Sequence, residues 1–153
     1  PGARLRSLKI ENEKTLDAPL VLRIRAEVHE LLRTNSSGKA VLKTVFPLRL
    51  AQLATLPTRQ TPMLLGSSSH VDVKFQIVLP ESMKMPASLP AGEARDGERF
   101  VTVSDTVNGH AITLVRTVDI PAGRVQPGAE YAKFVRFSQE ADALVEREIL
   151  IGR

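Results

Sequence analysis

The residues able to do chemistry are few in this chain. It carries three histidines, His29, His70 and His110, and no cysteine. Without cysteine there is no thiolate to act as a nucleophile or metal ligand, and no disulfide. A metal site of the zinc type needs three or four ligands that converge, whereas these histidines stand in an alternating run, after a serine run and after a turn. We therefore expect surface histidines, and we predict no metal and no cofactor.

The segment Ser67-Ser68-Ser69-His70 sets hydroxyl groups beside an imidazole, the pairing of a nucleophile and its base. No Gly-x-Ser-x-Gly pattern surrounds it, and a triad needs a geometry that this order does not imply. We expect a linker here. We predict no catalytic residues, and an enzyme is the least favoured of three hypotheses because Ser, His and acidic residues are scattered along the chain.

Glu93, Asp96 and Glu98 form the densest acidic cluster, in a segment rich in glycine and proline. A calcium loop would need a longer series of alternating oxygen ligands. We therefore expect a solvated loop.

Arg116 interrupts an apolar row of alternate residues that runs from Ile112 to Ile120. A charge in such a row must pair, reach solvent or face a partner. Glu140 or Asp142 on a helix docked over the row would be its mate. We expect a structural ion pair, and keep Arg116 as a candidate contact for a partner.

Met83 and Met85, with Leu89, form a small apolar patch in a proline-bearing connection. Such a patch either caps the open end of a sandwich or meets a neighbouring domain. The two methionines are the other candidate residues for contact with a partner.

The net charge is +4, and the basic residues are spread along the chain without interleaved aromatics. Nucleic-acid binding would favour a basic patch with stacking rings, so we predict no nucleic-acid partner. The apolar runs are far shorter than the roughly 20 residues of a membrane helix, so we predict no membrane insertion.

Two extended runs flank Asn108-Gly109, a pair that suits the positive φ angles of a tight hairpin turn. The second run, 111–120, is apolar or β-branched on both faces, which is typical of a central strand. Further strands are predicted at 6–11, 20–32, 39–50 (interrupted by Pro47), 71–79 and 148–151. A helical turn is predicted at 51–56. Loops are predicted at 81–98 and 121–127, the first with at most one short strand near 84–89. For 20–32 a helix over 26–33 is the alternative, since AEVHELLR is helical in composition.

From Gly128 the period of the apolar residues changes to three and four. The recurrence of Tyr131, Phe134, Phe137, Ala141 and Leu144 predicts a helix from about 129 to 145 that docks on the sheet. We predict one domain over 1–153, a mainly β, antiparallel β-sandwich of about seven to nine strands with one C-terminal α-helix. A chain that begins Pro-Gly-Ala is expected to be an excised fragment of a longer protein, and the resemblance described next implies that it is a C-terminal fragment.

The segment 116–151, with Pro127, Tyr131, Phe134 and Phe137 before a final apolar strand, resembles the C-terminal end of a group of exported bacterial proteins. Those proteins carry a transglutaminase-like core between two β-rich domains of unknown function. The run VDVKFQIVLP at 71–80 is similar to a strand of that family.

The resemblance implies a non-catalytic accessory module that follows the core, in a periplasmic or otherwise exported bacterial protein. The family's papain-like nucleophile would lie in the core domain, and this chain has no cysteine. The implied partner is the core, another domain of the parent protein or another protein. The alternative is a stand-alone β-sandwich module that binds peptide or glycan on a sheet face or edge, although the scarcity of Tyr and Trp counts against glycan.

Overall fold

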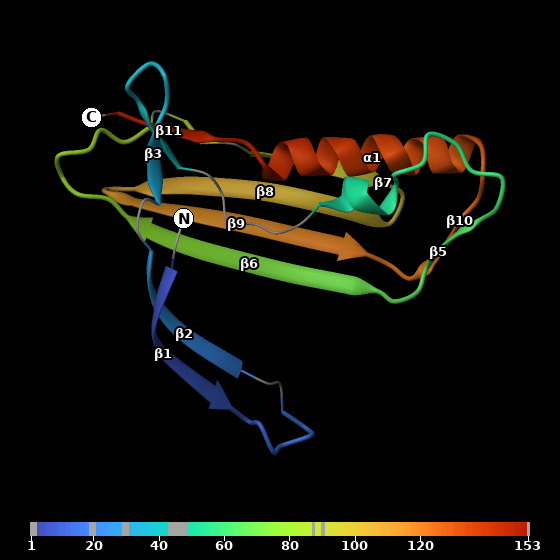
Figure 1. The fold of residues 1–153 in the computed structure, drawn as a ribbon, viewed down its shortest axis with the longest axis horizontal. Helices are drawn as coiled ribbons and strands as arrows, with labels where there is room; N and C mark the ends of the chain where they lie inside the picture. The colour runs from blue at the N-terminus through green and yellow to red at the C-terminus, as the bar shows by residue number, and fades with distance from the viewer. Residues whose placement is uncertain are drawn as a thin grey trace. The chain divides into compact units, whose positions relative to one another are not determined.

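The computed structural model divides the chain into two compact units, Pro1–Arg33 and Thr34–Arg153. The elements of each are shown in Figure 1. The residues that the structure describes are 3–18, 21–28, 31–42, 49–86, 88–89 and 91–152. Each unit is described by itself, and a single domain over 1–153 stays a prediction.

The first unit is an antiparallel hairpin of β1 (Ala3–Glu11) and β2 (Val21–Val28). The strand prediction for this region is confirmed, and the alternative helix over 26–33 is wrong in its described part. Residues up to Val28 continue β2, and Leu32–Thr34 form strand β3. Alternation of Leu and Ile with charged residues decides the outcome, because period two suits a strand and not a helix.

The second unit is built on a four-stranded antiparallel sheet in the order β6-β9-β8-β7. Its strands are β6 (Ser69–Val78), β9 (Ala111–Ile120), β8 (Arg99–Asn108) and β7 (Ala91–Asp96). The predicted central place of β9 is confirmed, because β9 pairs with β6 on one side and β8 on the other.

The turn between β8 and β9 differs from the prediction by one residue. Asn108 pairs with Ala111, so Gly109 and His110 make the two-residue loop. Gly109 has φ 57°, whereas Asn108 is not among the residues with positive φ. A glycine at the first loop position is what a type II′ turn requires.

The loop predicted for 81–98 is wrong in its last part, which forms β7. Asp96 pairs with Arg99 across a turn at Gly97, whose φ is 62°. Asp-Gly before a β-rich run is a hairpin signal, so the strand could have been found from the sequence.

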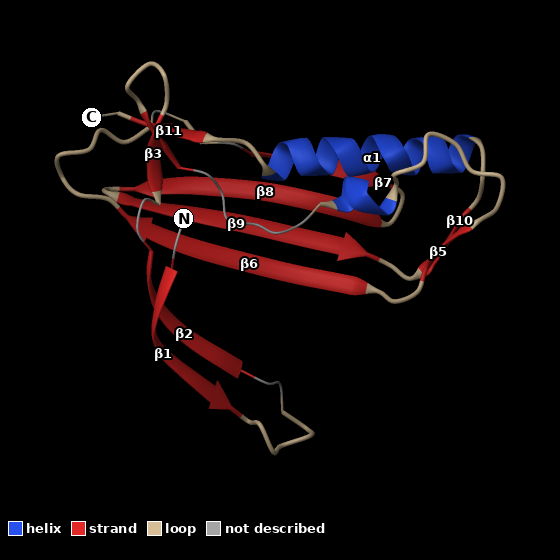
Figure 2. Cartoon of the chain, viewed as in Figure 1, coloured by secondary structure: helices blue, strands red, loops and turns tan. Residues whose placement is uncertain are grey.

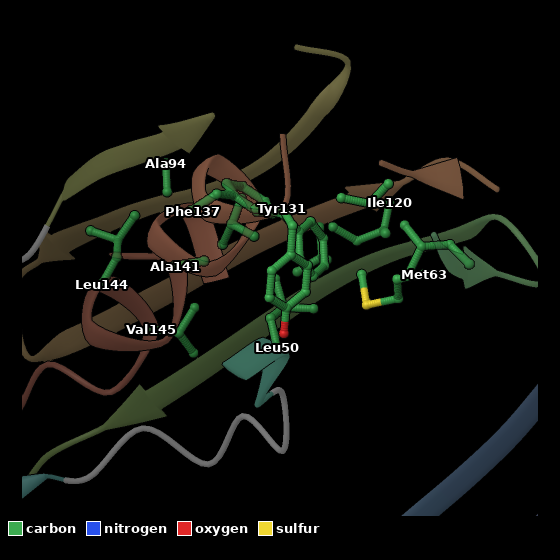
Figure 3. Packing of buried hydrophobic residues seen from close by; sticks show 14 of the residues in the cluster. Leu50, Met63, Ala94, Ile120, Tyr131, Phe137, Ala141, Leu144 and Val145 are labelled. Carbon is green, nitrogen blue, oxygen red and sulfur yellow. The ribbon is translucent and has the colours of Figure 1, made fainter. Parts of the chain in front are cut away.

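Helix α1 (Ala129–Val145) lies over one face of the sheet, as Figure 2 shows. It confirms the predicted helix, and it begins after Gly128, whose φ is 80°. The aromatic residues of α1 are buried against the sheet and against Leu50 and Met63 (Figure 3). The buried helix residues are Tyr131, Phe134, Phe137, Ser138, Ala141, Leu144 and Val145.

Short elements complete the second unit. Strand β5 (Met63–Leu65) pairs with β10 (Gly123–Val125), so the loop predicted for 121–127 is wrong at its centre. The strands β4 (Ala40–Leu42) and β11 (Ile149–Ile151) pair antiparallel. The predicted strand 39–50 cannot extend to its end, because Leu50–Leu53 forms a 3₁₀ helix, η1, in the place predicted for a helical turn. The interruption predicted at Pro47 lies outside the described residues.

The predicted fold class is confirmed in that the described chain is mainly β, with antiparallel sheets and one C-terminal helix, and α1 packs on the four-stranded sheet. Its eleven described strands exceed the predicted number because five of them span only three residues. None of the described helices has the length and apolar composition needed to cross a membrane.

Candidate functional site

Arg116 lies on the helix-facing side of β9 and is only 2% exposed. Its guanidinium forms a forked ion pair with Asp105 of β8, with Nη2 2.9 Å from Oδ2, and Nη1 also donates to the carbonyl of Val115 at 2.8 Å. The predicted structural ion pair is confirmed, but the predicted mates, Glu140 and Asp142, are wrong. Asp105 stands diagonally opposite in the adjacent strand, close enough for a long side chain to reach.

Asp142 serves a different purpose. Its carboxylate accepts hydrogen bonds from the backbone N–H groups of Leu50, at 2.7 Å, and Ala51, at 2.9 Å. The 3₁₀ helix η1 has no side-chain cap from its own N-cap residue, Arg49. Asp142 therefore caps η1 from α1 and fixes the two helices together.

His70, at the start of β6, is the described histidine with the most organised surroundings. Its Nδ1 lies 2.9 Å from Asp119 Oδ2 and its Nε2 lies 2.9 Å from Asp72 Oδ2. The hydrogen bond with Asp119, followed by that with Asp72, raises the pKa of His70 from its ordinary value of 6.5. The hydroxyl of Thr117, at 2.7 Å, and the His70 ring lower the pKa of Asp72.

This arrangement argues against the hydrolytic pairing of Ser67, Ser68 or Ser69 with His70. Both ring nitrogens face carboxylate oxygens, and only a protonated imidazole donates from both. A ring whose two nitrogens both contact carboxylates has neither nitrogen free to accept the proton of a serine hydroxyl. Ser68 Oγ instead accepts the backbone N–H of Ala122 at 3.0 Å.

The same cluster fixes the expected response to pH. The contribution of His70 to stability should be complete below pH 6.5 and be lost as pH rises through its raised folded-state pKa. The contribution of Asp72 should be present above 3.8 and be lost as pH falls through its lowered pKa. We therefore expect the difference in melting temperature between the wild type and His70→Gln to be largest between these two values. Thermal unfolding as a function of pH, with an NMR titration of His70, measures it; a difference that is independent of pH would refute the network's role.

The remaining predicted site residues lie apart from this cluster. Glu93 and Asp96 belong to strand β7, so the solvated loop that we predicted for them is wrong. Glu93 forms an ion pair with Arg95, and Asp96 forms one with Arg99. His110 lies in the hairpin turn and His29 lies outside the described residues. Among the described residues, no group of three or more His, Asp or Glu is arranged to hold a metal ion.

Met83 and Met85 are half-buried, as is Leu89. The segment is tied to the C-terminal strand through Lys84 and Gly152, whose backbone groups exchange hydrogen bonds of 3.1 and 3.0 Å. A groove of about 510 Å³ lies beside it, lined by Pro86, Ser88, Leu89 and residues 147–150. The methionines as partner contacts stay a prediction.

The first unit presents an apolar face. In the hairpin register Leu8 is opposite Ile24, Ile10 is opposite Leu22 and Leu5 is opposite Ala26. The irregularity between Leu5 and Ser7 keeps Leu5 on the same face as Leu8. The Leu and Ile side chains of this face are 45% to 64% exposed, so the alternating strand predicted over 20–32 has an apolar face that is exposed.

Comparison with known proteins finds one similar fold. No family model and no curated protein matches the sequence. A crystal structure of a protein from Parabacteroides distasonis, provisionally described as a protease, is similar with a TM-score of 0.58 and 23% identity. The match covers 74% of this chain and 23% of that chain. The chain thus spans less than a quarter of the protein that it resembles, and the likeness concerns the fold alone.

Proposed function

We propose that this chain is a non-catalytic accessory module of an exported, periplasmic bacterial protein with a transglutaminase-like core, and that it acts by packing on that core or on a partner. The observation that carries the proposal is the apolar face of the β1–β2 hairpin. Five Leu and Ile side chains on one face of a two-stranded hairpin are exposed. Contiguous exposed apolar surface of this kind marks a protein interaction site.

The opposite face of the hairpin is organised by charge. Glu11 accepts contacts from Lys9, at 2.9 Å, and Arg23, at 3.0 Å, and Arg6 pairs with Glu27. The hydrogen bonds with Lys9 and Arg23 hold the pKa of Glu11 below its ordinary value. A two-stranded hairpin by itself is only marginally stable. These ion pairs therefore favour an ordered hairpin, whose apolar face is free to pack against a partner.

The similar fold supports the proposal in one respect. It occurs as part of a much longer protein provisionally described as a protease, as expected of a module that serves a catalytic domain. The lack of a cysteine agrees with a catalytic nucleophile located elsewhere.

The proposal predicts that charge on the apolar face abolishes packing. Leu8→Asp and Ile24→Lys should each weaken binding of this chain to the separately produced core domain of its parent protein by about tenfold or more, because burying an unpaired charge opposes association. Isothermal titration calorimetry measures the affinity. Arg25→Ser, on the charged face, is the matched control and should bind as the wild type does. Absence of binding by the wild type, or equal binding by Ile24→Lys, would overturn the proposal.

The alternative function, a stand-alone module that binds an extended peptide, draws on a different observation. Strand β6 forms an edge of the four-stranded sheet over ten residues. A free edge can accept an added strand.

A further inference from the structure

Strand β6 is the longer edge of the four-stranded sheet in the described structure. It pairs with β9 from Ser69 to Val78, and its other side has no partner strand in the sheet. Phe75 is 40% exposed and Val78 is 72% exposed. Edge strands of this length are a template for further strand pairing unless they are covered or guarded by charge.

The side chains of β6 are self-complementary. Asp72 and Lys74 lie two residues apart on the outer face, and Val71, Val73 and Phe75 alternate with them on the inner face. An antiparallel strand placed against itself by a two-fold axis pairs residues at equal distances from the axis, and keeps each face on its own side. A two-fold axis at Val73 therefore places oppositely charged side chains opposite each other on the outer face. It places apolar side chains opposite each other on the inner face.

We propose that a second copy of this chain occupies the β6 edge, with the two β6 strands paired antiparallel about a two-fold axis at Val73. Asp72 then lies opposite Lys74 of the second copy, and Val71 lies opposite Phe75 of the second copy. The two four-stranded sheets become one sheet of eight strands. This pairing does not depend on the accessory role of the β1–β2 hairpin.

Charge favours this register over three others. A centre at Asp72 sets two aspartates against each other, and a centre at Lys74 sets two lysines against each other. A centre at Phe75 sets Asp72 against Val78. Like charges directly opposite are destabilising and opposite charges are stabilising, so the centre at Val73 is favoured over all three.

Asp72 is available for this contact although it takes part in the His70 cluster. Its side chain is 66% exposed. His70 uses Oδ2 and Thr117 uses Oδ1, and each carboxylate oxygen has a second lone pair. Phe75, on the inner face, would be covered by Val71 of the second copy.

The test uses the full chain in sedimentation equilibrium from about 1 µM to about 1 mM, the range of weak association. The wild type should dimerise. Lys74→Asp and Asp72→Lys should each weaken self-association by roughly tenfold or more, because both copies of the pair become repulsive. An equimolar mixture of the two variants should associate again, because the aspartates of one variant lie opposite the lysines of the other. Lys133→Asp, an exposed residue of α1 with the same change in charge, should dimerise as the wild type does.

Each result decides the proposal. Association of the mixture but of neither variant alone confirms the register. A wild type that stays monomeric at every concentration overturns the proposal. In that case either Asp72 and Lys74 protect the β6 edge from strand pairing, or the edge binds a peptide. A dimer whose affinity is changed by neither Lys74→Asp nor Asp72→Lys also overturns the proposal. Circular dichroism of each variant verifies folding, and Lys74→Gln, which removes the attraction without adding repulsion, provides a milder variant that should weaken association less.

Discussion

Replacement of Arg116 by methionine is expected to lower the free energy of unfolding by about 3–5 kcal/mol, the usual cost of removing one member of a buried ion pair. The side chains of Arg116 and Asp105 are 2% and 0% exposed. Without the guanidinium, the Asp105 carboxylate keeps a single described donor, the backbone N–H of Val115 at 3.2 Å. Denaturation by guanidinium chloride at neutral pH measures the loss.

The double replacement Arg116→Met with Asp105→Leu is the control. Exchange of a whole buried pair for apolar residues of similar volume is often neutral or stabilising, so the double variant should recover most of the lost stability. Arg116→Lys should recover only part of it, because an ammonium cannot reproduce the forked contact. A double variant as unstable as Arg116→Met would show that packing around Arg116, and not the charge pair, supports the sheet.

The long periodic elements of this fold could be predicted from the sequence. Alternation in β6 and β9 and the three- and four-residue spacing in α1 are local signals, since each strand or helix buries one side of itself. Helix α1 lies where the spacing of Tyr131 and Phe134 places it. Strands of three residues, such as β5 and β10, carry too few residues to show a period, and they form because the partner strand is brought near by the rest of the fold.

The polar contacts could be predicted only in kind. A charge in the apolar row of β9 implies a buried partner, but the partner's identity depends on the register of the hairpin. Asp105 interrupts the inward row of β8 that includes Val101 and Val103, just as Arg116 interrupts that of β9. Opposite charges that interrupt the inward rows of two strands joined by a tight turn are therefore a signal for a diagonal ion pair. No comparable signal exists for Asp142, whose partners are more than ninety residues away in the chain.

The apolar pattern of the first unit shows a different limit. The sequence predicts which face of β2 is apolar, and the hairpin register confirms that Leu22 and Ile24 share it. The alternation of apolar and polar residues does not indicate what packs against that face, because the residues that cover it belong to another element or another chain.

Asp142→Ala should lower the free energy of unfolding by about 2–4 kcal/mol, since hydrogen bonds to a charged acceptor contribute roughly 1.5–3 kcal/mol each and this site is only partly buried. The backbone N–H groups of Leu50 and Ala51 lose their acceptor, and η1 has no cap of its own. Because Leu50 belongs to the core that α1 covers, release of η1 should also expose that core.

The loss should be seen in denaturation curves and in faster hydrogen exchange at the amides of Leu50 and Ala51. Asp142→Asn keeps one acceptor oxygen and should be intermediate. Glu140→Ala, at an exposed position of the same helix, should change stability by no more than about 0.5 kcal/mol. Equal effects of the changes at Glu140 and Asp142 would contradict the capping role. A selective effect at Asp142 would show that a single carboxylate of α1 joins η1 to the helix layer of the fold.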